Sequence, residues 1–242
     1  MPLLGTLLNA AGILLGGILG LALRRQFKPN TQLLLKNILG LLVIWVGLST
    51  TWKSLGGGIL GVAKQMTIVV LALILGRLTG RLLHLQKGLN KLGEYAKDRF
   101  AKASTGGAPQ KWSEGFITCT VLFCVGPMAI LGSVQDGLNG KWQTLGIKAV
   151  MDGLATMAFV GSFGWGAILS VVPVVACQGT LTLAARLLAP QLQNPALIDS
   201  INATGGLLVF CISLIIFELK KIELADYLPS LAWAPLITWV WK

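Results

Sequence analysis

Charged residues are scarce in this sequence: they make up 12% of its 242 residues, whereas hydrophobic residues make up 54%. Soluble domains usually have about a quarter of their residues charged. A chain of this length is long enough for two soluble domains, but the polar residues needed to cover their surfaces are missing. The composition therefore predicts an all-α polytopic membrane protein.

Groups that bind metals or carry out acid–base and nucleophilic catalysis are also few. The single histidine, His84, has no cluster of cysteine, histidine or carboxylate residues beside it, which disfavours a metal site or a Ser/His/Asp set. The four cysteines lie in apolar stretches without CxxC spacing, as small buried hydrophobic residues do. No glycine-rich phosphate loop followed by Lys-Ser/Thr occurs. We expect no catalytic residue, no metal and no cofactor, and hence no enzyme.

Long apolar runs, by contrast, recur along the chain. A bilayer core requires ~20 largely apolar residues per helix. Seven stretches approach this length: residues 2–23, 34–52, 55–76, 115–133, 145–160, 164–188 and 201–219. An eighth, 228–241, is short and rich in tryptophan, which suits the membrane interface. We predict seven to eight transmembrane segments, the last one short or re-entrant.

Positive charges concentrate in alternate connections between these segments. Because basic loops resist translocation, they mark the cytoplasmic side. The first, third and seventh connections hold most of the lysines and arginines: Arg24, Arg25, Lys28, Arg77, Arg81, Lys87, Lys91, Lys97, Arg99, Lys102, Lys111, Lys220 and Lys221. We therefore predict that the odd-numbered loops are cytoplasmic and that both termini lie outside. The net charge of +11 then requires no nucleic-acid partner.

The longest connection, residues 85–111, places apolar residues at helical intervals between basic ones. This pattern is typical of a helix that lies on anionic lipid headgroups. A solvated helical loop is the alternative. Membrane lipids are accordingly the first partners that we expect.

Two parts of the sequence resemble each other in the same order over some sixty residues. Residues 16–20 resemble 126–132, with Ile-Leu-Gly in one register of 112 residues, and that register places Lys36 on Lys148. Three crossings separate the two parts, so they would run oppositely through the membrane, as the repeats of many transporters do; chance similarity between apolar segments is the alternative. The predicted divisions are a first three-helix unit at 1–84, a basic connector at 85–112, a second, inverted three-helix unit at 113–190 and C-terminal membrane segments at 191–242.

Glycines recur every four residues in the first segment, at Gly12, Gly16 and Gly20. Small residues at this spacing let helix backbones approach closely in lipid. We predict a helix-packing role for these three and for Gly126 and Gly132.

Asp152 is the most exceptional residue, because it lies about two turns inside an apolar segment. An ionised carboxylate at that depth is costly unless it is paired or hydrated. Lys148 lies four residues earlier on the same helical face. Two interpretations stay open: a structural ion pair, or a pair that contacts the substrate or exchanges a proton.

Polar residues in two other segments are further candidates for a solute pathway. Pro173 precedes Gln178-Gly179 in a long apolar run, which indicates either a broken helix with Gln178 as a ligand or a simple proline kink. Asn9 and Asn202 each lie near a predicted outer helix end. They cap those helices, the role that we expect, form hydrogen bonds between helices, or line an entrance.

The stretch 124–140 (CVGPMAILGSVQDGLNG) ends in a polar tip. Its Asp-Gly and Asn-Gly dipeptides favour turns, so residues 135–140 are expected to form an extracytoplasmic connector. Gln135 and Asp136 remain candidates for an entrance that admits solute.

Several stretches together resemble a known family. They are residues 5–10 (GTLLNA), 123–138 (FCVGPMAILGSVQDGL), 148–153 (KAVMDG), 178–183 (QGTLTL) and 205–208 (GGLL). They are similar to the bacterial inner-membrane proteins of the YqgA/YdfK type, called domain of unknown function 554. The resemblance implies a multi-pass protein of the bacterial cytoplasmic membrane and a transport role, but it names no substrate and no catalytic residue.

The repeat, the interrupted sixth segment and the buried Asp152 together favour a small-solute or ion transporter or channel. Its pathway would run between the two inverted units, and assembly into a homo-oligomer is compatible with it. The alternative is a membrane binding or scaffold protein whose basic connector recruits lipid or a cytoplasmic partner. In that case Asp152 and Gln178 would serve packing only.

Overall fold

A computed structural model describes residues 3–23, 29–88, 90–91, 110–124, 127–192 and 194–241. All regular elements in these residues are helices, so the predicted all-α class is confirmed for the part that the structure describes. Of the predicted connector 85–111, residues 85–88 form a helical turn and 92–109 lie outside the described residues.

Five described helices are long and apolar enough to cross a membrane: Leu4–Leu23, Ile59–Leu82, Gln143–Gly161, Gly166–Leu188 and Pro195–Ile216. A sixth span results if the bent pair Gly115–Cys124 and Met128–Asn139, which meet at 56°, counts as one crossing. These helices identify a multi-pass membrane protein. The predicted number of seven to eight segments remains a prediction.

Contacts divide the chain into two compact units, Met1–Leu35 with Leu89–Arg186 and Lys36–Gly88 with Leu187–Lys242. Each unit therefore combines an early and a late part of the sequence. The predicted repeat concerns equivalence between helices rather than contacts between them, so it too remains a prediction.

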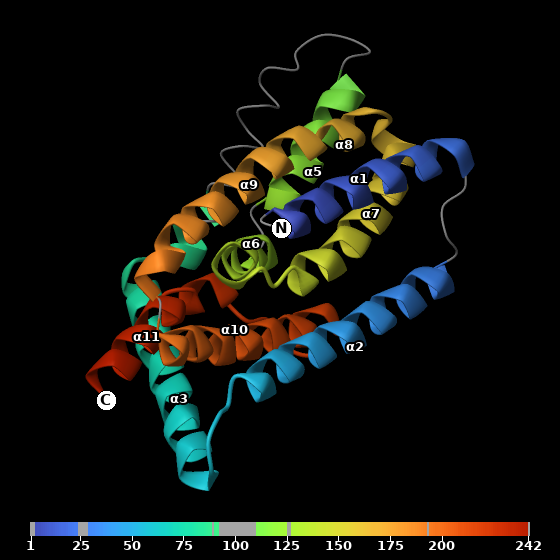
Figure 1. The fold of residues 1–242 in the computed structure, drawn as a ribbon. Coiled ribbons are helices and arrows are strands. Elements are labelled where there is room, and N and C mark those ends of the chain that lie inside the picture. Colours follow the sequence, from blue (N-terminus) through green and yellow to red (C-terminus); the bar gives the residue numbers. More distant parts are fainter. Residues whose placement is uncertain are drawn as a thin grey trace. The chain divides into compact units, whose positions relative to one another are not determined.

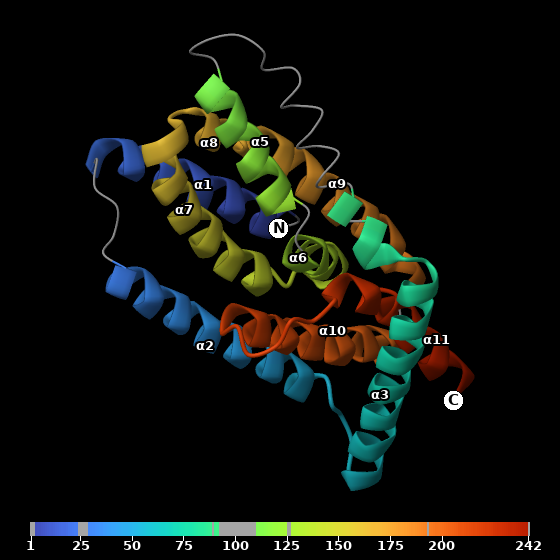
Figure 2. The ribbon, with the colours of Figure 1, turned by 180° about the vertical axis from the view of Figure 1, so that it is seen from behind.

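The first unit is organised around one central helix, α7. Both ribbon views show α1 lying along α7 (Figures 1 and 2), and α5, α6 and α8 also pack against α7. Ile13, Phe123, Val160 and Val174 form the apolar core between these helices. The helices of this unit are α1 (Leu4–Leu23), α5 (Gln110–Cys124), α6 (Pro127–Asn139), α7 (Gln143–Phe163), α8 (Gly166–Leu169) and α9 (Val171–Leu188), the last as far as Arg186.

In the second unit, α3, α10 and α11 pack against one another, and the short helix η2 lies on α3 and α10. Helix α10 begins with Asn194, whose side chain accepts a hydrogen bond from the Ala196 N–H, followed by Pro195, a favoured combination for a helix start. The elements of this unit are α2 (Pro29–Lys53, from Lys36 on), α3 (Ile59–Leu82), η1 (Ala189–Leu192), α10 (Pro195–Ile216), η2 (Leu224–Tyr227) and α11 (Ser230–Val240). With 11 residues, α11 has about half the length needed to span a bilayer.

Several predicted segment boundaries are wrong. The third segment, predicted at 55–76, is α3 at Ile59–Leu82, because Gly56, Gly57 and Gly58 delay the helix start. The fourth, predicted as one helix at 115–133, consists of α5 and α6. The tip predicted as a connector from residue 135 stays helical to Asn139, and the chain turns at Gly140, whose φ is +65°.

Candidate functional site

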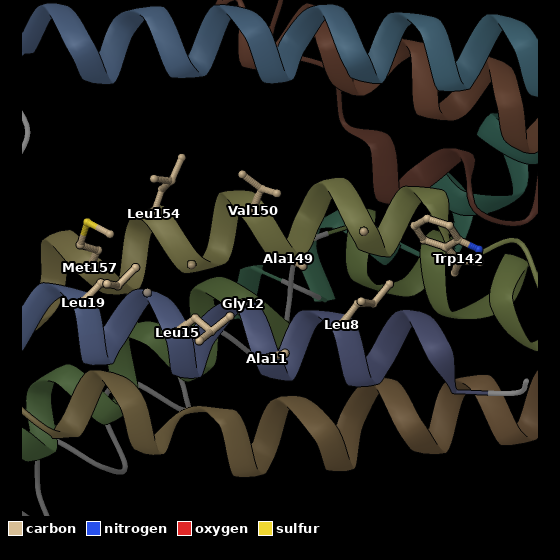
Figure 3. Close-up of a pocket in the computed structure, with 13 residues that line it drawn as sticks. Leu8, Ala11, Gly12, Leu15, Leu19, Trp142, Ala149, Val150, Leu154 and Met157 are labelled. Carbon is tan, nitrogen blue, oxygen red and sulfur yellow. The ribbon is translucent and has the colours of Figure 1, made fainter.

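Glycines hold α1 close to α7. A Cβ added at Gly12 or Gly16 would overlap the carbonyl oxygen of Ala149 or Gly153, and one at Gly20 would lie 2.6 Å from the carbonyl oxygen of Met157. Figure 3 shows Gly12 of α1 facing Ala149 of α7. These backbones can therefore approach only because side chains are absent, and the approach brings polar residues of α1 next to those of α7.

An apolar groove of about 430 Å³ follows the same pair of helices. Leu8, Leu15 and Leu19 line it from α1, and Val150 and Leu154 line it from α7 (Figure 3). The groove contains no charged side chain. The polar residues of the unit lie elsewhere, in its interior.

Four predicted site residues meet in that interior. The Asn9 side chain of α1 donates hydrogen bonds from Nδ2 to Asp152 Oδ2 (3.0 Å) and to Gln178 Oε1 (3.3 Å). Lys148 Nζ lies 2.7 Å from Asp152 Oδ1 and 2.6 Å from Oδ2. We call Asn9, Lys148, Asp152 and Gln178 the polar cluster; it joins α1, α7 and α9.

The polar cluster is closed to solvent: Asn9 and Gln178 are 0% exposed, Lys148 5% and Asp152 6%. Removing a carboxylate and an ammonium group from water costs several kcal/mol per ion, and their attraction offsets this only when the geometry is good. Here the ammonium reaches both carboxylate oxygens, and it also lies 5.6 Å from the centre of the Phe123 ring, a favourable cation–π distance. The pair is therefore well compensated as long as both partners are present.

Two atoms of the polar cluster keep unused hydrogen-bonding capacity. Asn9 Oδ1, an acceptor, and Gln178 Nε2, a donor, are buried and have no hydrogen-bond partner among the described residues. Leaving a buried polar group unpaired costs about 1–3 kcal/mol. The cluster thus has one acceptor and one donor that a polar solute or an ion with its water can use.

Asn9 is not a helix cap, the role that we expected; the alternative, hydrogen bonds between helices, is what the structure shows. It lies in the interior of α1, and its side chain bonds across to two other helices. The sequence places it near a helix end, but only the packing of α1 against α7 and α9 supplies these partners.

Of the two interpretations of the sixth segment, a helix that is broken at Gln178 is not what the structure shows. Gln178 and Gly179 lie in the continuous helix α9. Pro173 is the third residue of that helix, where the missing N–H has no intrahelical partner to lose. The irregular segment comes earlier, at Gly164–Trp165 and Ser170 on either side of the four-residue α8.

Gln135 and Asp136 are buried in α6 rather than exposed in a turn, with exposed fractions of 3% and 1%. Asp136 Oδ2 accepts a hydrogen bond from the Gly5 N–H (3.1 Å), and Gln135 Oε1 accepts one from Thr144 Oγ1 (2.7 Å). Both residues therefore tie α6 to its neighbours. Asp136 Oδ1 and Gln135 Nε2 have no partner among the described residues.

The remaining predicted residues belong to the second unit, to the contact of α6 with α7, or to the part of the chain outside the described residues. Asn202 is buried in α10 and belongs to the second unit, and it is not a cap. Gly132 faces Leu145 and Thr144, so it packs α6 against α7. Gly126 lies outside the described residues.

Sequence reasoning missed a polar stripe along α7. Thr144, Lys148, Asp152 and Thr156 follow one another at intervals of four residues and are all buried. Thr182, one turn after Gln178 on α9, is buried as well. The i, i+4 spacing of polar residues within apolar helices was the available signal, since it places them on one face.

Comparison with known proteins agrees with the sequence resemblance. The family model described as "Protein of unknown function (DUF554)" matches residues 4–239. The chain belongs to the DUF554 family. Among the described residues of this DUF554 protein, no group of three or more histidine, cysteine or carboxylate side chains is placed to hold a metal ion.

Two curated DUF554 relatives match over nearly their whole lengths. The "Uncharacterized protein YqgA" of Escherichia coli (strain K12) is 30% identical over 240 residues, which cover 98% of this chain and 97% of the relative. The "Uncharacterized membrane protein YdfK" of Bacillus subtilis (strain 168) is 27% identical over 236 residues, covering 98% and 96%. No solved structure matches.

Proposed function

We propose that this DUF554 protein is a small-solute or ion transporter or channel and that the polar cluster is part of its pathway. The observation that carries the proposal is the meeting of Asn9, Lys148, Asp152 and Gln178 at one buried point. Ionisable residues inside membrane helices are expensive, and where they occur they commonly mark pathways for ions, protons or substrates.

The polar stripe on α7 supports a pathway rather than an isolated ion pair. From Thr144 to Thr156 it covers three intervals of four residues, which is about 18 Å at 1.5 Å per residue. The hydrocarbon core is ~30 Å thick. Buried polar side chains therefore extend over more than half of that thickness.

The ion pair provides a means of opening and closing this pathway. A cation that approaches Asp152 competes with the Lys148 ammonium, and an anion that approaches Lys148 competes with the carboxylate. Either exchange leaves the displaced partner, Lys148 or Asp152, without its counter-ion, which is costly in a low-dielectric interior, so the pair re-forms once the solute ion leaves. Asn9 and Gln178 contribute amide groups beside the pair.

The repeat and the location belong to the same proposal. Asn9 comes from the first predicted repeat unit, and Lys148, Asp152 and Gln178 come from the second, as expected for a site between inverted units. We place the protein in the bacterial cytoplasmic membrane with its basic loops inside and both termini outside, without enzymatic activity, and with assembly of several copies as an option. The membrane name of the Bacillus relative supports the membrane part of this proposal.

The flux of solutes across the membrane of reconstituted liposomes tests the proposal. Purified wild-type protein is reconstituted and assayed against sodium, potassium, chloride, protons and small organic acids. The Asp152→Asn variant keeps the shape of the side chain but removes the charge that Lys148 needs. We expect its flux to fall at least tenfold, the equivalent of about 1.4 kcal/mol. Glu218→Gln removes one carboxylate from an exposed residue of the second unit that does not line the polar cluster and is the control.

Two results would count against the proposal. If folded wild-type protein gives no flux above empty vesicles for any solute, the binding or scaffold interpretation is favoured. If Asp152→Asn transports as well as wild type, the polar cluster is not in the pathway.

A further inference from the structure

The second unit contains a cavity of about 540 Å³ at the C-terminal ends of α3 and α10. Its charged lining comes from two places. Arg77 lies in the C-terminal part of α3, and Lys220, Lys221 and Glu223 lie in the loop after α10. Its apolar lining comes from helix interiors, with Leu73 one turn before Arg77 and Leu208 two turns before the end of α10. The cavity thus has its charged groups near the helix ends and an apolar wall that continues along the helices, and Ile222 and Leu224 add apolar surface beside the charges.

The charged side chains that line the cavity carry a net positive charge, and the basic ones can bind an anion. Three basic side chains face one carboxylate, that of Glu223. Arg77, Lys220 and Lys221 are exposed, and among the described residues none of them forms an ion pair. The Arg77 guanidinium lies over the Tyr227 ring, 5.5 Å from its centre, so its position is fixed without a carboxylate.

Stabilisation of helix C-termini is the plain alternative, because basic residues there complement the helix dipole. That role needs no cavity. It also does not explain the apolar wall on α10, which reaches from Leu214 back to Leu208, about 9 Å along the helix axis.

We propose that this cavity binds an anionic phospholipid. The phosphate of the headgroup contacts Arg77, Lys220 and Lys221, and the upper part of an acyl chain lies along Leu73, Leu208 and Leu214. The ends of two candidate spans, Ile59–Leu82 and Pro195–Ile216, place the basic residues at headgroup level, and basic cavities between such helices recognise anionic headgroups on the cytoplasmic side. A free phosphate ion would use the charges but not the apolar wall.

Native mass spectrometry in detergent tests the proposal by counting retained lipids per chain. Wild-type protein is titrated with phosphatidylglycerol, with phosphatidylcholine of the same chains, and with glycerol phosphate, which has the anionic group but no acyl chain. The test variant is the triple change Arg77→Gln, Lys220→Gln and Lys221→Gln. Its matched control, Arg81→Gln, Lys87→Gln and Lys91→Gln, removes the same residue types from exposed positions outside the cavity.

We expect wild-type protein to retain phosphatidylglycerol in preference to the other two ligands. The cavity triple variant should weaken that retention at least tenfold, since each basic residue near a headgroup contributes roughly a fivefold factor, whereas the control triple should change it less than threefold. Equal retention by the two triple variants would overturn the proposal. So would glycerol phosphate that binds as tightly as the lipid, which would indicate a free-anion site.

Two further variants keep the test decisive if the triple variant does not fold. Lys221→Gln alone should weaken retention roughly fivefold. Cys211→Phe places a larger apolar side chain in the cavity without changing its charge. It should weaken the retention of phosphatidylglycerol but leave any binding of glycerol phosphate unchanged. The assay measures how much lipid the protein retains and not the flux of solutes, so its outcome is independent of the transport proposal.

Discussion

The two contact units bury polar side chains in different ways. In the first unit, Asn9, Lys148, Asp152 and Gln178 bond to one another across three helices. Two of these residues are ionisable, and all are nearly inaccessible. Such an arrangement exists only when the three helices are assembled.

In the second unit, buried hydroxyl groups are satisfied mainly by backbone carbonyls of their own helix. Thr51 donates to Gly47 O, Ser213 to Phe210 O and Thr238 to Ala234 O. The bonds that do cross between elements lie near helix ends: Trp233 donates to Thr79, and the buried Asp226 accepts from the Gln86 N–H. Local satisfaction makes a polar residue tolerable in lipid without any partner helix. Under the transport proposal, this difference assigns the pathway to the first unit.

The largest expected effect comes from leaving the Asp152 carboxylate without its partner. Lys148→Met should lower the free energy of unfolding in lipid–detergent micelles by about 3–5 kcal/mol, because one buried charge stays uncompensated. The double change Lys148→Met with Asp152→Leu should recover most of that loss. Lys64→Met, at an exposed lysine of α3 in the second unit, should change stability by less than about 0.5 kcal/mol. Equal losses at Lys148 and Lys64 would remove the distinction between the units.

A middle-sized effect is expected from two glycines that face backbone carbonyls, one in each unit. A Cβ at Gly16 would overlap Gly153 O, and one at Gly80 would overlap Asp226 O. Gly16→Ala and Gly80→Ala should each cost about 1–3 kcal/mol in unfolding free energy through overpacking. Gly56→Ala, where nothing lies within 4 Å, is the control. Only Gly16→Ala should reduce flux, because only α1 brings Asn9 to the polar cluster; a flux loss in Gly80→Ala alone would contradict this assignment.

The smallest expected effect concerns a satisfied hydroxyl in the second unit. Thr51 Oγ1 lies 3.1 Å from both Gly47 O and Ala203 O. Thr51→Val keeps the shape and removes these bonds, so we expect a loss of about 0.5–1.5 kcal/mol in unfolding free energy. Flux and lipid retention measured as above should stay at wild-type levels. A transport defect here would show that the second unit also takes part in the pathway.

Much of the candidate site could be predicted from single residues. A carboxylate with a lysine four residues earlier in an apolar run has few explanations, and Asp152 and Lys148 do form an ion pair. Gln178 was predicted as a candidate ligand for the wrong reason, since α9 is not broken there. Asn9 and Asn202 look alike in the sequence, yet Asn9 joins the polar cluster and Asn202 lies in the other unit.

Local pattern failed where tertiary contacts decide. Asp-Gly and Asn-Gly predicted a turn from residue 135, but α6 continues to Asn139 because Gln135 and Asp136 find partners in Thr144 and in the Gly5 N–H. Turn propensity of these residues rests on local hydrogen bonds. In α6, hydrogen bonds to Thr144 and to the Gly5 N–H take the place of those local turn bonds.

By itself, the sequence determined that this protein is an all-helical, multi-pass membrane protein of the DUF554 family, because composition and the lengths of apolar runs fix how a chain meets a bilayer. Only the tertiary structure decided which polar residues share one site. That choice depends on which helices lie side by side, and here it follows from the contact of Gly12 and Gly16 with α7. Residues far apart in the chain become hydrogen-bond partners only through such packing, which no local periodicity encodes.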